Sequence, residues 1–146
     1  MGSLSYPLIA IIKLLGLNYT SVDFVSYRNK NIIDIYTKII LKYDKEIATG
    51  NVGIGVKKEG ELIISGTKGN IYVPSPWWKT EYFEVRFEDQ NKNQKFFIKF
   101  EEDGLRYELA EFLNSINNHI PNISLNQSER IAISKLIEEF NNKEKE

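Results

Sequence analysis

The sequence predicts an α+β fold in which helices cover one face of a large, mostly antiparallel sheet. The first observation is the order of patterns, because one amphipathic helical segment precedes a long stretch of period-two segments and two more helical segments follow. The second is that separators such as Asp44-Lys45 and 66–69 are short and polar, so they join antiparallel neighbours. The third is that all three helical segments have one apolar face, which leaves the opposite face of the sheet open.

The first expected element is a helix near the N-terminus. Leu8, Ile11, Ile12 and Leu15 recur at the spacing of one helical face, and Gly16 is typical of a helix end. We expect this face to be buried.

Strands are expected from Thr20 to Phe100, where β-branched and aromatic residues alternate with polar ones. In the second strand, Ile35, Thr37 and Ile39 share one face while Lys38 and Lys42 share the other, so one face is core and the other is mixed. The seven expected strands are Thr20–Tyr27, Ile33–Tyr43, Glu46–Val56, Glu61–Ser65, Asn70–Val73, Tyr82–Glu88 and Phe96–Phe100.

Two more helices are expected after the strands. The first carries Leu109, Phe112, Leu113 and Ile116 on one face. The second carries the apolar side chains Ile133, Leu136, Ile137 and Phe140. Ser124 and Gln127 have the spacing of a capping box for that last helix.

Length and composition exclude several classes of protein. The 146 residues predict a single domain over 1–146 with a frayed tail at 141–146, and they are too few for a complete two-domain enzyme that carries its own dinucleotide fold. A net charge of -1 argues against nucleic acid as a partner. The absence of cysteine and the single histidine, His119, exclude thiolate chemistry and multi-histidine metal sites within one chain, and we expect a cytoplasmic protein. No apolar run reaches the ~20 residues of a membrane span.

The glycines do not indicate a dinucleotide loop. Gly53, Gly55 and Gly60 precede another strand rather than a helix, so we interpret them as a bulge or tight hairpin. Gly66 and Gly69 flank Thr67-Lys68, and we expect them to supply positive φ in a hairpin.

The most unusual segment is the proline-stiffened stretch that contains Trp77, Trp78 and Lys79. An indole offers a plane for the C–H face of a sugar, and a lysine beside it can bind oxygens. The alternative is that the tryptophans fill an intersubunit or loop-packing pocket. Arg106 and Tyr107 are further candidate substrate contacts, although a structural ion pair accounts equally well for Arg106.

Several stretches together resemble the C-terminal domain of the Gfo/Idh/MocA oxidoreductases, the family of glucose-fructose oxidoreductase and inositol dehydrogenase. The resemblance covers almost the whole chain. It rests on the order and spacing of Tyr6–Leu8, Leu14–Gly16, Leu62–Pro74, Pro76–Lys79 and Gly104–Glu108.

This resemblance implies a sheet whose open face forms a substrate pocket and subunit contacts. Complete members have a preceding Rossmann domain that binds NAD or NADP and supplies a catalytic lysine, and neither is present here. The family often has an aspartate followed four residues later by histidine or tyrosine. Tyr6 matches the second position and is the candidate catalytic residue, whereas Gly2 occupies the first.

We therefore expect a C-terminal piece of a longer protein: the substrate-binding and oligomerisation domain of an NAD(P)-dependent sugar or cyclitol oxidoreductase. It binds no cofactor or metal and is inactive alone. Expected partners are a further copy of the chain, the missing Rossmann domain and a sugar-type molecule. The alternative is a stand-alone scaffold that uses the open sheet face for assembly.

Overall fold

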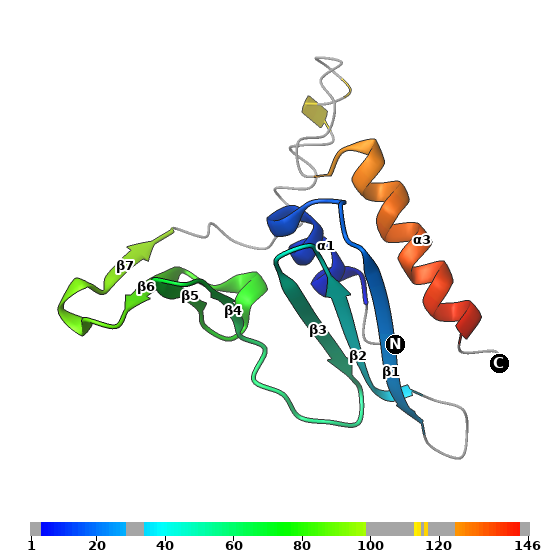
Figure 1. Cartoon of the computed structure of the whole chain (residues 1–146), viewed down its shortest axis with the longest axis horizontal. Coiled ribbons are helices and arrows are strands. Elements are labelled where there is room, and N and C mark those ends of the chain that lie inside the picture. The colour runs from blue at the N-terminus through cyan, green and yellow to red at the C-terminus, as the bar shows by residue number, and fades with distance from the viewer. Residues whose placement is uncertain (1–3, 29–33, 99–112, 115, 117–124, 144–146) are drawn as a thin grey trace. The chain divides into compact units, whose positions relative to one another are not determined.

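The computed structural model describes residues 4–28, 34–98, 113–114, 116 and 125–143, and it confirms the α+β class (Figure 1). The chain forms two compact units, the first comprising Met1–Lys57 with Glu111–Glu146 and the second comprising Lys58–Ala110. Each contains an antiparallel sheet with its strands in sequence order, β1-β2-β3 in the first unit and β4-β5-β6-β7 in the second. The strands thus form two meanders rather than one continuous sheet.

The first unit contains two long helices and three strands among the described residues. They are α1 (Ser5–Leu15), β1 (Ser21–Arg28), β2 (Asp34–Lys42), β3 (Ile47–Gly53) and α3 (Gln127–Lys143). Helix α1 ends where the sequence predicts. Gly16 has a φ of 80°, and its N–H donates to the carbonyl of Ile12 at 2.9 Å. A positive φ at this position favours glycine, because glycine has no Cβ that would clash with the backbone.

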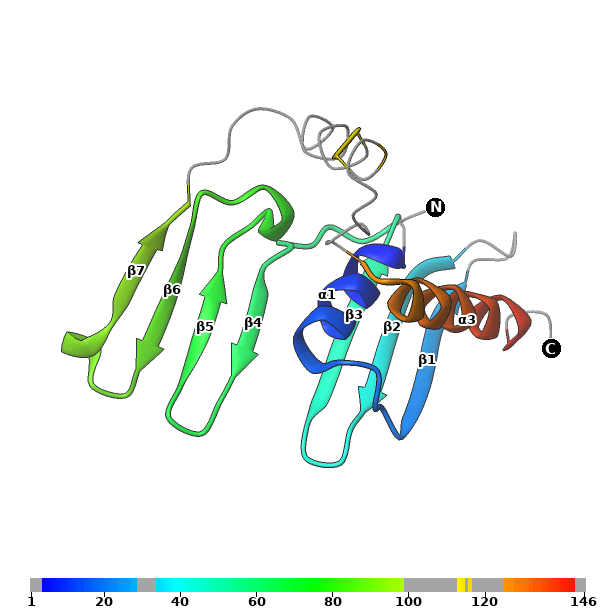
Figure 2. The ribbon, with the colours of Figure 1, turned by 90° about the horizontal axis from the view of Figure 1, so that it is seen from above.

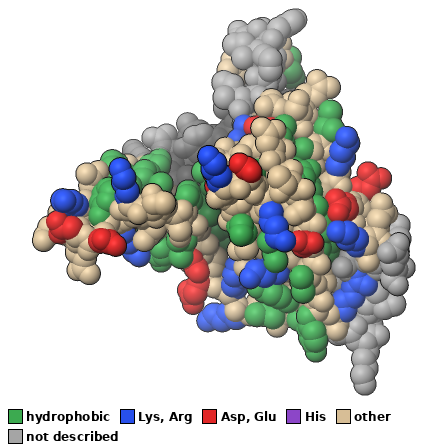
Figure 3. All heavy atoms as spheres, viewed as in Figure 1, with side chains coloured by type: hydrophobic (Ala, Val, Ile, Leu, Met, Phe, Trp, Pro, Cys, Tyr) green, Lys and Arg blue, Asp and Glu red, His purple; other side chains and the backbone are tan. Residues whose placement is uncertain are grey.

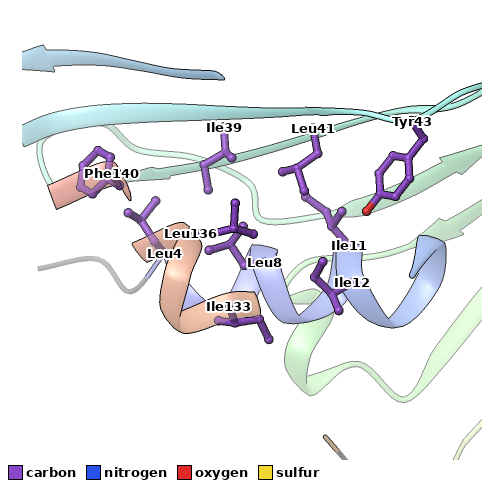
Figure 4. Close-up of a cluster of buried hydrophobic side chains, with 10 residues drawn as sticks. All are labelled: Leu4, Leu8, Ile11, Ile12, Ile39, Leu41, Tyr43, Ile133, Leu136 and Phe140. Atoms are coloured by element: carbon purple, nitrogen blue, oxygen red, sulfur yellow. The ribbon is translucent and has the colours of Figure 1, made fainter. Parts of the chain in front are cut away.

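Both helices pack on one face of the β1–β3 sheet (Figure 2). Figure 4 shows their side chains directed toward those of β2. The alternation predicted for the second strand is confirmed, since Thr37, Ile39 and Leu41 are buried while Lys38 and Lys42 are exposed. Each fully buried Leu or Ile contributes about 1.5–3 kcal/mol of transfer free energy. The buried apolar cluster consists of Leu4, Leu8, Ile11, Ile12, Ile39, Leu41, Tyr43, Ile133, Leu136 and Phe140.

The hydroxyls of Thr37 and Tyr43 inside this unit are hydrogen-bonded, whereas the side-chain oxygen of Asn51 on β3 is buried without a recorded partner in the described part of the chain. The buried Thr37 hydroxyl lies 3.0 Å from the hydroxyl of Ser26 on the neighbouring strand. The Tyr43 hydroxyl donates to the carbonyl of Gly16 at 3.0 Å and so links the end of β2 to the end of α1. Burial raises the pKa of Tyr43 above its ordinary value of 10.0, which keeps this donor protonated.

The N-terminus of α3 has a capping box, but not the predicted one. Ser124 lies outside the described residues, and Gln127 is the first residue of the helix. The Asn126 side-chain oxygen accepts from the N–H of Glu129 at 2.9 Å, and the Glu129 carboxylate accepts from the N–H of Asn126 at 2.8 Å. The expected pair was wrong by two residues because the sequence repeats polar residues at the same spacing. The helix continues to Lys143, which forms an ion pair with Glu139 at 3.0 Å.

The second unit is a four-stranded sheet with two short turns of 3-10 helix. Its elements are β4 (Leu62–Ser65), β5 (Gly69–Val73), η1 (Trp77–Lys79), β6 (Tyr82–Phe87), η2 (Gln90–Lys92) and β7 (Gln94–Phe97). The register gives this sheet one apolar face and one mixed face. The apolar face carries Leu62, Ile64, Ile71, Val73, Phe83, Val85, Phe87 and Phe96. Among the described residues, the apolar side chains classed as buried all belong to the first unit.

β3 and β4 belong to separate sheets, and the chain leaves β3 through an irregular turn rather than a hairpin. The N–H groups of Ile54 and Gly55 both donate to the carbonyl of Ile35, at 3.0 and 3.3 Å. A Cβ on Gly55 would lie 2.5 Å from the Ile35 side chain, so glycine is required for this close approach. The two hydrogen bonds to one carbonyl are typical of a bulge at Ile54 and Gly55, and the next element is the strand β4 rather than a helix.

The β4–β5 hairpin depends on glycine for a reason that differs from the prediction. Within the described chain, Gly16 and Gly60 are the glycines with positive φ, so the expectation for Gly66 and Gly69 was wrong. A Cβ on Gly69 would instead lie 2.4 Å from the carbonyl oxygen of Arg86 on β6. Glycine is needed here because the two backbones approach closely.

Gly50→Ala should destabilise the protein by about 1–3 kcal/mol, because a buried Cβ at this position would lie 2.7 Å from Cβ of the rigid Pro7 ring on α1. Chemical denaturation followed by circular dichroism measures the effect. Thr49→Ala, at the neighbouring exposed position, is the control and should change stability by no more than about 0.5 kcal/mol. Equal stability of the two variants would contradict close packing of α1 on β3.

Acidification should weaken the α1–α3 contact through Glu129. The Glu129 carboxylate accepts a hydrogen bond from the Lys13 ammonium at 2.8 Å, and this bond, followed by that from Asn126, lowers its pKa below 4.5. The stabilisation is therefore complete above the ordinary carboxyl pKa and is lost as pH falls through the lower folded value.

Glu129→Gln should be less stable than wild type at pH 7, and the difference should shrink on acidification. Denaturation midpoints measured across this range test the expectation. Glu138→Gln, which removes an exposed charge from the same helix, controls for net charge. A pH-independent difference for Glu129→Gln would contradict the ionic contribution.

Candidate functional site

The two tryptophans lie in a turn that follows β5. Residues 77–79 form the 3-10 turn η1, and the indoles of Trp77 and Trp78 meet edge to face with their centroids 6.0 Å apart. The Lys79 N–H donates to the carbonyl of Pro76 at 2.9 Å and closes the turn. The tryptophans and the lysine, predicted together from sequence, are thus held in one compact turn.

This turn is tied to the segment that precedes β4. The Trp77 N–H donates to the carbonyl of Gly60 at 2.9 Å, and the Ser75 hydroxyl donates to the carbonyl of Glu59. Gly60 has a φ of 78°, and a Cβ there would lie 3.4 Å from the Trp78 ring. The positive φ favours glycine at this position, and the Trp78 ring lies next to it, a contact that sequence reasoning missed. The signal that could have found it is the glycine before a strand in a chain with a tryptophan-rich loop.

The arrangement leaves one indole accessible to a ligand. Trp78 is 56% exposed although its loop is fixed by hydrogen bonds, whereas the neighbouring Trp77 is half-buried. A large apolar ring that is exposed on a fixed loop provides a stacking surface at little cost in conformational entropy. The geometry suits a flat or saturated ring that lies against Trp78.

Tyr6, the candidate catalytic residue, lies in the first turn of α1 and is 59% exposed. It belongs to the first unit, whereas Trp77 and Trp78 belong to the second, so the structure describes these candidates in two separate settings. Arg106 and Tyr107, like His119, lie outside the described residues.

A second cluster, which we call the cation–aromatic ladder, was not found from sequence. It comprises Tyr72, Tyr82, Glu84, Arg86 and Lys95 on the mixed face of the second sheet. The Arg86 guanidinium lies 3.9 Å from the Tyr72 ring centroid and 2.6 Å from the Glu84 carboxylate. The Lys95 ammonium lies 3.4 Å from the Tyr82 centroid and 3.8 Å from the same carboxylate. The alternation of residues 82–86 already places Tyr82, Glu84 and Arg86 on one face of a strand. That Tyr72 and Lys95 lie beside them follows only from the pairing of β6 with β5 and β7.

Other parts of the described structure carry weaker candidates for a binding or catalytic site. A hollow of about 320 Å³ along α3 is lined by charged and polar side chains of that single helix, including Lys135 and Glu139. Among the described residues, no three His, Cys, Asp or Glu side chains form a group that could hold a metal ion, and no helix is long and apolar enough to cross a membrane. Figure 3 shows lysine and arginine interspersed with acidic side chains on the visible face.

No family model matches the sequence, and the search of curated proteins also found no match. The fold, in contrast, matches solved structures. The structure of UDP-N-acetylglucosamine 3-dehydrogenase GnnA from Acidithiobacillus ferrooxidans superposes with a TM-score of 0.72 at 14% identity, over 92% of this chain and 44% of that one. A second crystal form of the same enzyme gives a TM-score of 0.74 at 13% identity, over 91% of this chain and 42% of that one.

Proteins classed as oxidoreductases from two other bacteria show the same relation. YPO2259 from Yersinia pestis has a TM-score of 0.66 at 18% identity, over 92% of this chain and 44% of that one. YvaA from Bacillus subtilis has a TM-score of 0.66 at 14% identity, over 92% of this chain and 45% of that one. The chain spans less than half the length of these proteins. The chain therefore shares its fold with part of these oxidoreductases, in agreement with the fold that the sequence resemblance implies.

Proposed function

We propose that this chain is the substrate-binding and oligomerisation domain of an NAD(P)-dependent sugar or cyclitol oxidoreductase, and that it is inactive without a separate nucleotide-binding domain. The observation that carries the proposal is the superposition of 92% of the chain on 44% of a sugar-nucleotide dehydrogenase. An oxidoreductase of that length has room for a second domain, and the proposal assigns the cofactor to it.

The described residues support this division of labour because they do not fit a dinucleotide. A pyrophosphate is usually held by a glycine-rich turn that leaves a strand and opens a helix, so that helical N–H groups face the phosphates. Here the glycine-rich segment 53–60 leaves β3 and leads to β4, another strand. No step of the reaction is therefore derived for a cofactor bound to this chain.

The substrate contacts that we propose are those that the sequence singles out. Trp78 stacks against a sugar or cyclitol ring, supported by the edge-to-face contact with Trp77 and by Lys79 in the same turn. Arg106 and Tyr107 complete the proposed set, and the exposed Tyr6 hydroxyl binds or moves a proton at a substrate hydroxyl. What supports the stacking role is the fixed, exposed Trp78 ring.

The proposed oligomerisation surface is the face of the first sheet opposite the helices. Exposed Val25 and Tyr27 on β1 and Ile47 on β3 lie on this face, beside an ion pair of 3.6 Å between Asp23 and Lys42. Contact with a second copy would remove the apolar side chains from water.

Sugar binding can be tested with single-tryptophan variants, because the chain has two tryptophans. Trp77→Phe retains Trp78 as the fluorophore, and Trp78→Phe retains Trp77. Titration with UDP-N-acetylglucosamine and with myo-inositol should change the emission of Trp77→Phe, because a ring that stacks on Trp78 alters its solvent exposure.

Trp78→Phe should respond at least several-fold less, since its remaining indole is half-buried. UMP and glycerol serve as ligands that lack the pyranose or cyclitol ring. A response confined to Trp78→Phe, or an equal response to UMP, would contradict stacking on Trp78.

The division of labour can be tested with the cofactor itself. Calorimetric titration of the chain with NADH and NADPH should show no micromolar binding, because the glycine segment leads from strand to strand. Incubation with NAD and UDP-N-acetylglucosamine should produce no NADH absorbance. Tight nucleotide binding or turnover by the chain alone would overturn the proposal.

A further inference from the structure

The outer strand of the second sheet has an exposed apolar edge. β7 is the last strand in the order β4-β5-β6-β7, and all four of its residues are exposed (Figure 2). The fractional exposures are 41% for Phe96, 76% for Phe97 and 56% for the following Ile98. Proteins usually protect such edges with proline, bulges or charges, since unpaired backbone groups there bind other strands.

Backbone direction shows which groups this edge presents. The Ile98 N–H donates to the carbonyl of Glu81 at 2.7 Å, so residue 98 faces the β6 side. Because N–H and C=O groups alternate sides along a strand, Phe96 also faces β6, while Lys95 and Phe97 direct their N–H and C=O groups outward. Among the described residues, no hydrogen-bond partner is recorded for these outward N–H and C=O groups.

The charged residue of β7 does not block the edge. The Lys95 ammonium lies over the Tyr82 ring and near the Glu84 carboxylate, both on the mixed face of its own sheet. The lysine is therefore held against the face and away from the outward backbone groups. An incoming strand would meet apolar side chains and free backbone donors.

We propose that β7 pairs antiparallel with β7 of a second copy of this chain, with Phe96 on the two-fold axis. In this register, Lys95 lies opposite Phe97 of the other copy, and Phe97 lies opposite its Lys95. Both pairs are of the hydrogen-bonded type, so every outward N–H and C=O of the two residues is used. The partner is a second copy because the segment is complementary to itself in this register.

Charge and aromatic contacts select this register over its neighbours. Centring on Lys95 would place two ammonium groups opposite each other, which is unfavourable. Centring on Phe97 would pair only that residue with itself within the described strand. Centring on Phe96 places each lysine beside an aromatic ring, as Lys95 already lies 5.3 Å from its own Phe97 ring.

The same register extends an aromatic stack across the contact. Phe96 stacks on Phe83 of β6 with centroids 5.0 Å apart and an interplanar angle of 15°. A non-hydrogen-bonded pair on the axis brings its two side chains close together, about 4.5 Å between Cα atoms. The row of rings then runs from Phe83 through both Phe96 rings to the second Phe83. This contact uses a sheet edge of the second unit and is distinct from the open face of the first.

Disulfide trapping can test the register, because the natural chain has no cysteine. Phe96→Cys should form a disulfide-linked dimer under mild oxidation, since its two Cα atoms face each other across the axis. Phe97→Cys should remain largely without a disulfide link between copies, because its two Cα atoms are diagonal and more than about 7 Å apart. Preferential linking of Phe97→Cys, or linking of neither variant, would overturn the register.

A second pair of variants keeps Phe96 and its stack. Phe97→Pro removes an outward N–H and leaves the β6–β7 hydrogen bonds in place, whereas Phe97→Thr loses the same ring but keeps the N–H. Sedimentation velocity should show the same rise of mass with concentration for wild type and Phe97→Thr. Phe97→Pro should show a smaller rise, limited to association through the open face of the first sheet. Circular dichroism checks that both variants fold.

Association of Phe97→Pro at the level of Phe97→Thr would overturn edge pairing. That outcome would leave the open-face contact and the sugar-binding proposal untouched. Conversely, the loss of sugar binding by the single-tryptophan variants does not affect the mass measurements.

Discussion

The first unit depends on burial of one strip of apolar side chains between β2 and two helices from opposite ends of the chain. Ile39 and Leu41 are fully buried on the sheet, and Leu8, Ile12 and Leu136 cover them from α1 and α3. Isolated helices of 11 and 17 residues are marginally stable in water, so α1 and α3 both depend on packing against these buried side chains. The Lys13–Glu129 contact, 2.8 Å long, then sets how the two helices meet.

The second unit is stabilised differently. Its apolar face is half-buried, and its mixed face is held by cations that lie over tyrosine rings and share the Glu84 carboxylate. Such contacts are individually modest, typically about 0.5–1 kcal/mol at exposed sites. A unit of this kind has apolar surface left for other molecules. The Trp78 platform and the β7 edge are the two places where that surface is best organised.

The fold and the candidate site were predictable to different degrees. The seven strands were found close to their observed bounds because alternation and short polar separators are local signals. The separation into two sheets was missed because strand pairing is not a local signal. The approach of Gly55 to Ile35, for example, depends on contacts between residues twenty positions apart. The Gly66–Gly69 hairpin was placed correctly, but its reason was wrong, since the carbonyl of Arg86 is distant in sequence.

Among the described residues, the sequence by itself determined the class, the order and nearly the bounds of the helices and strands, and the buried faces of β2, α1 and α3. These follow from the periods of 2 and 3.6 residues, which each segment carries on its own. Only the tertiary structure decided that the Trp78 ring lies next to Gly60, that the Glu84 carboxylate contacts two cations, and that the outward backbone groups of β7 belong to Lys95 and Phe97. Each of these depends on strand register and on close approach between segments, and no local pattern encodes a distance between residues far apart in the chain.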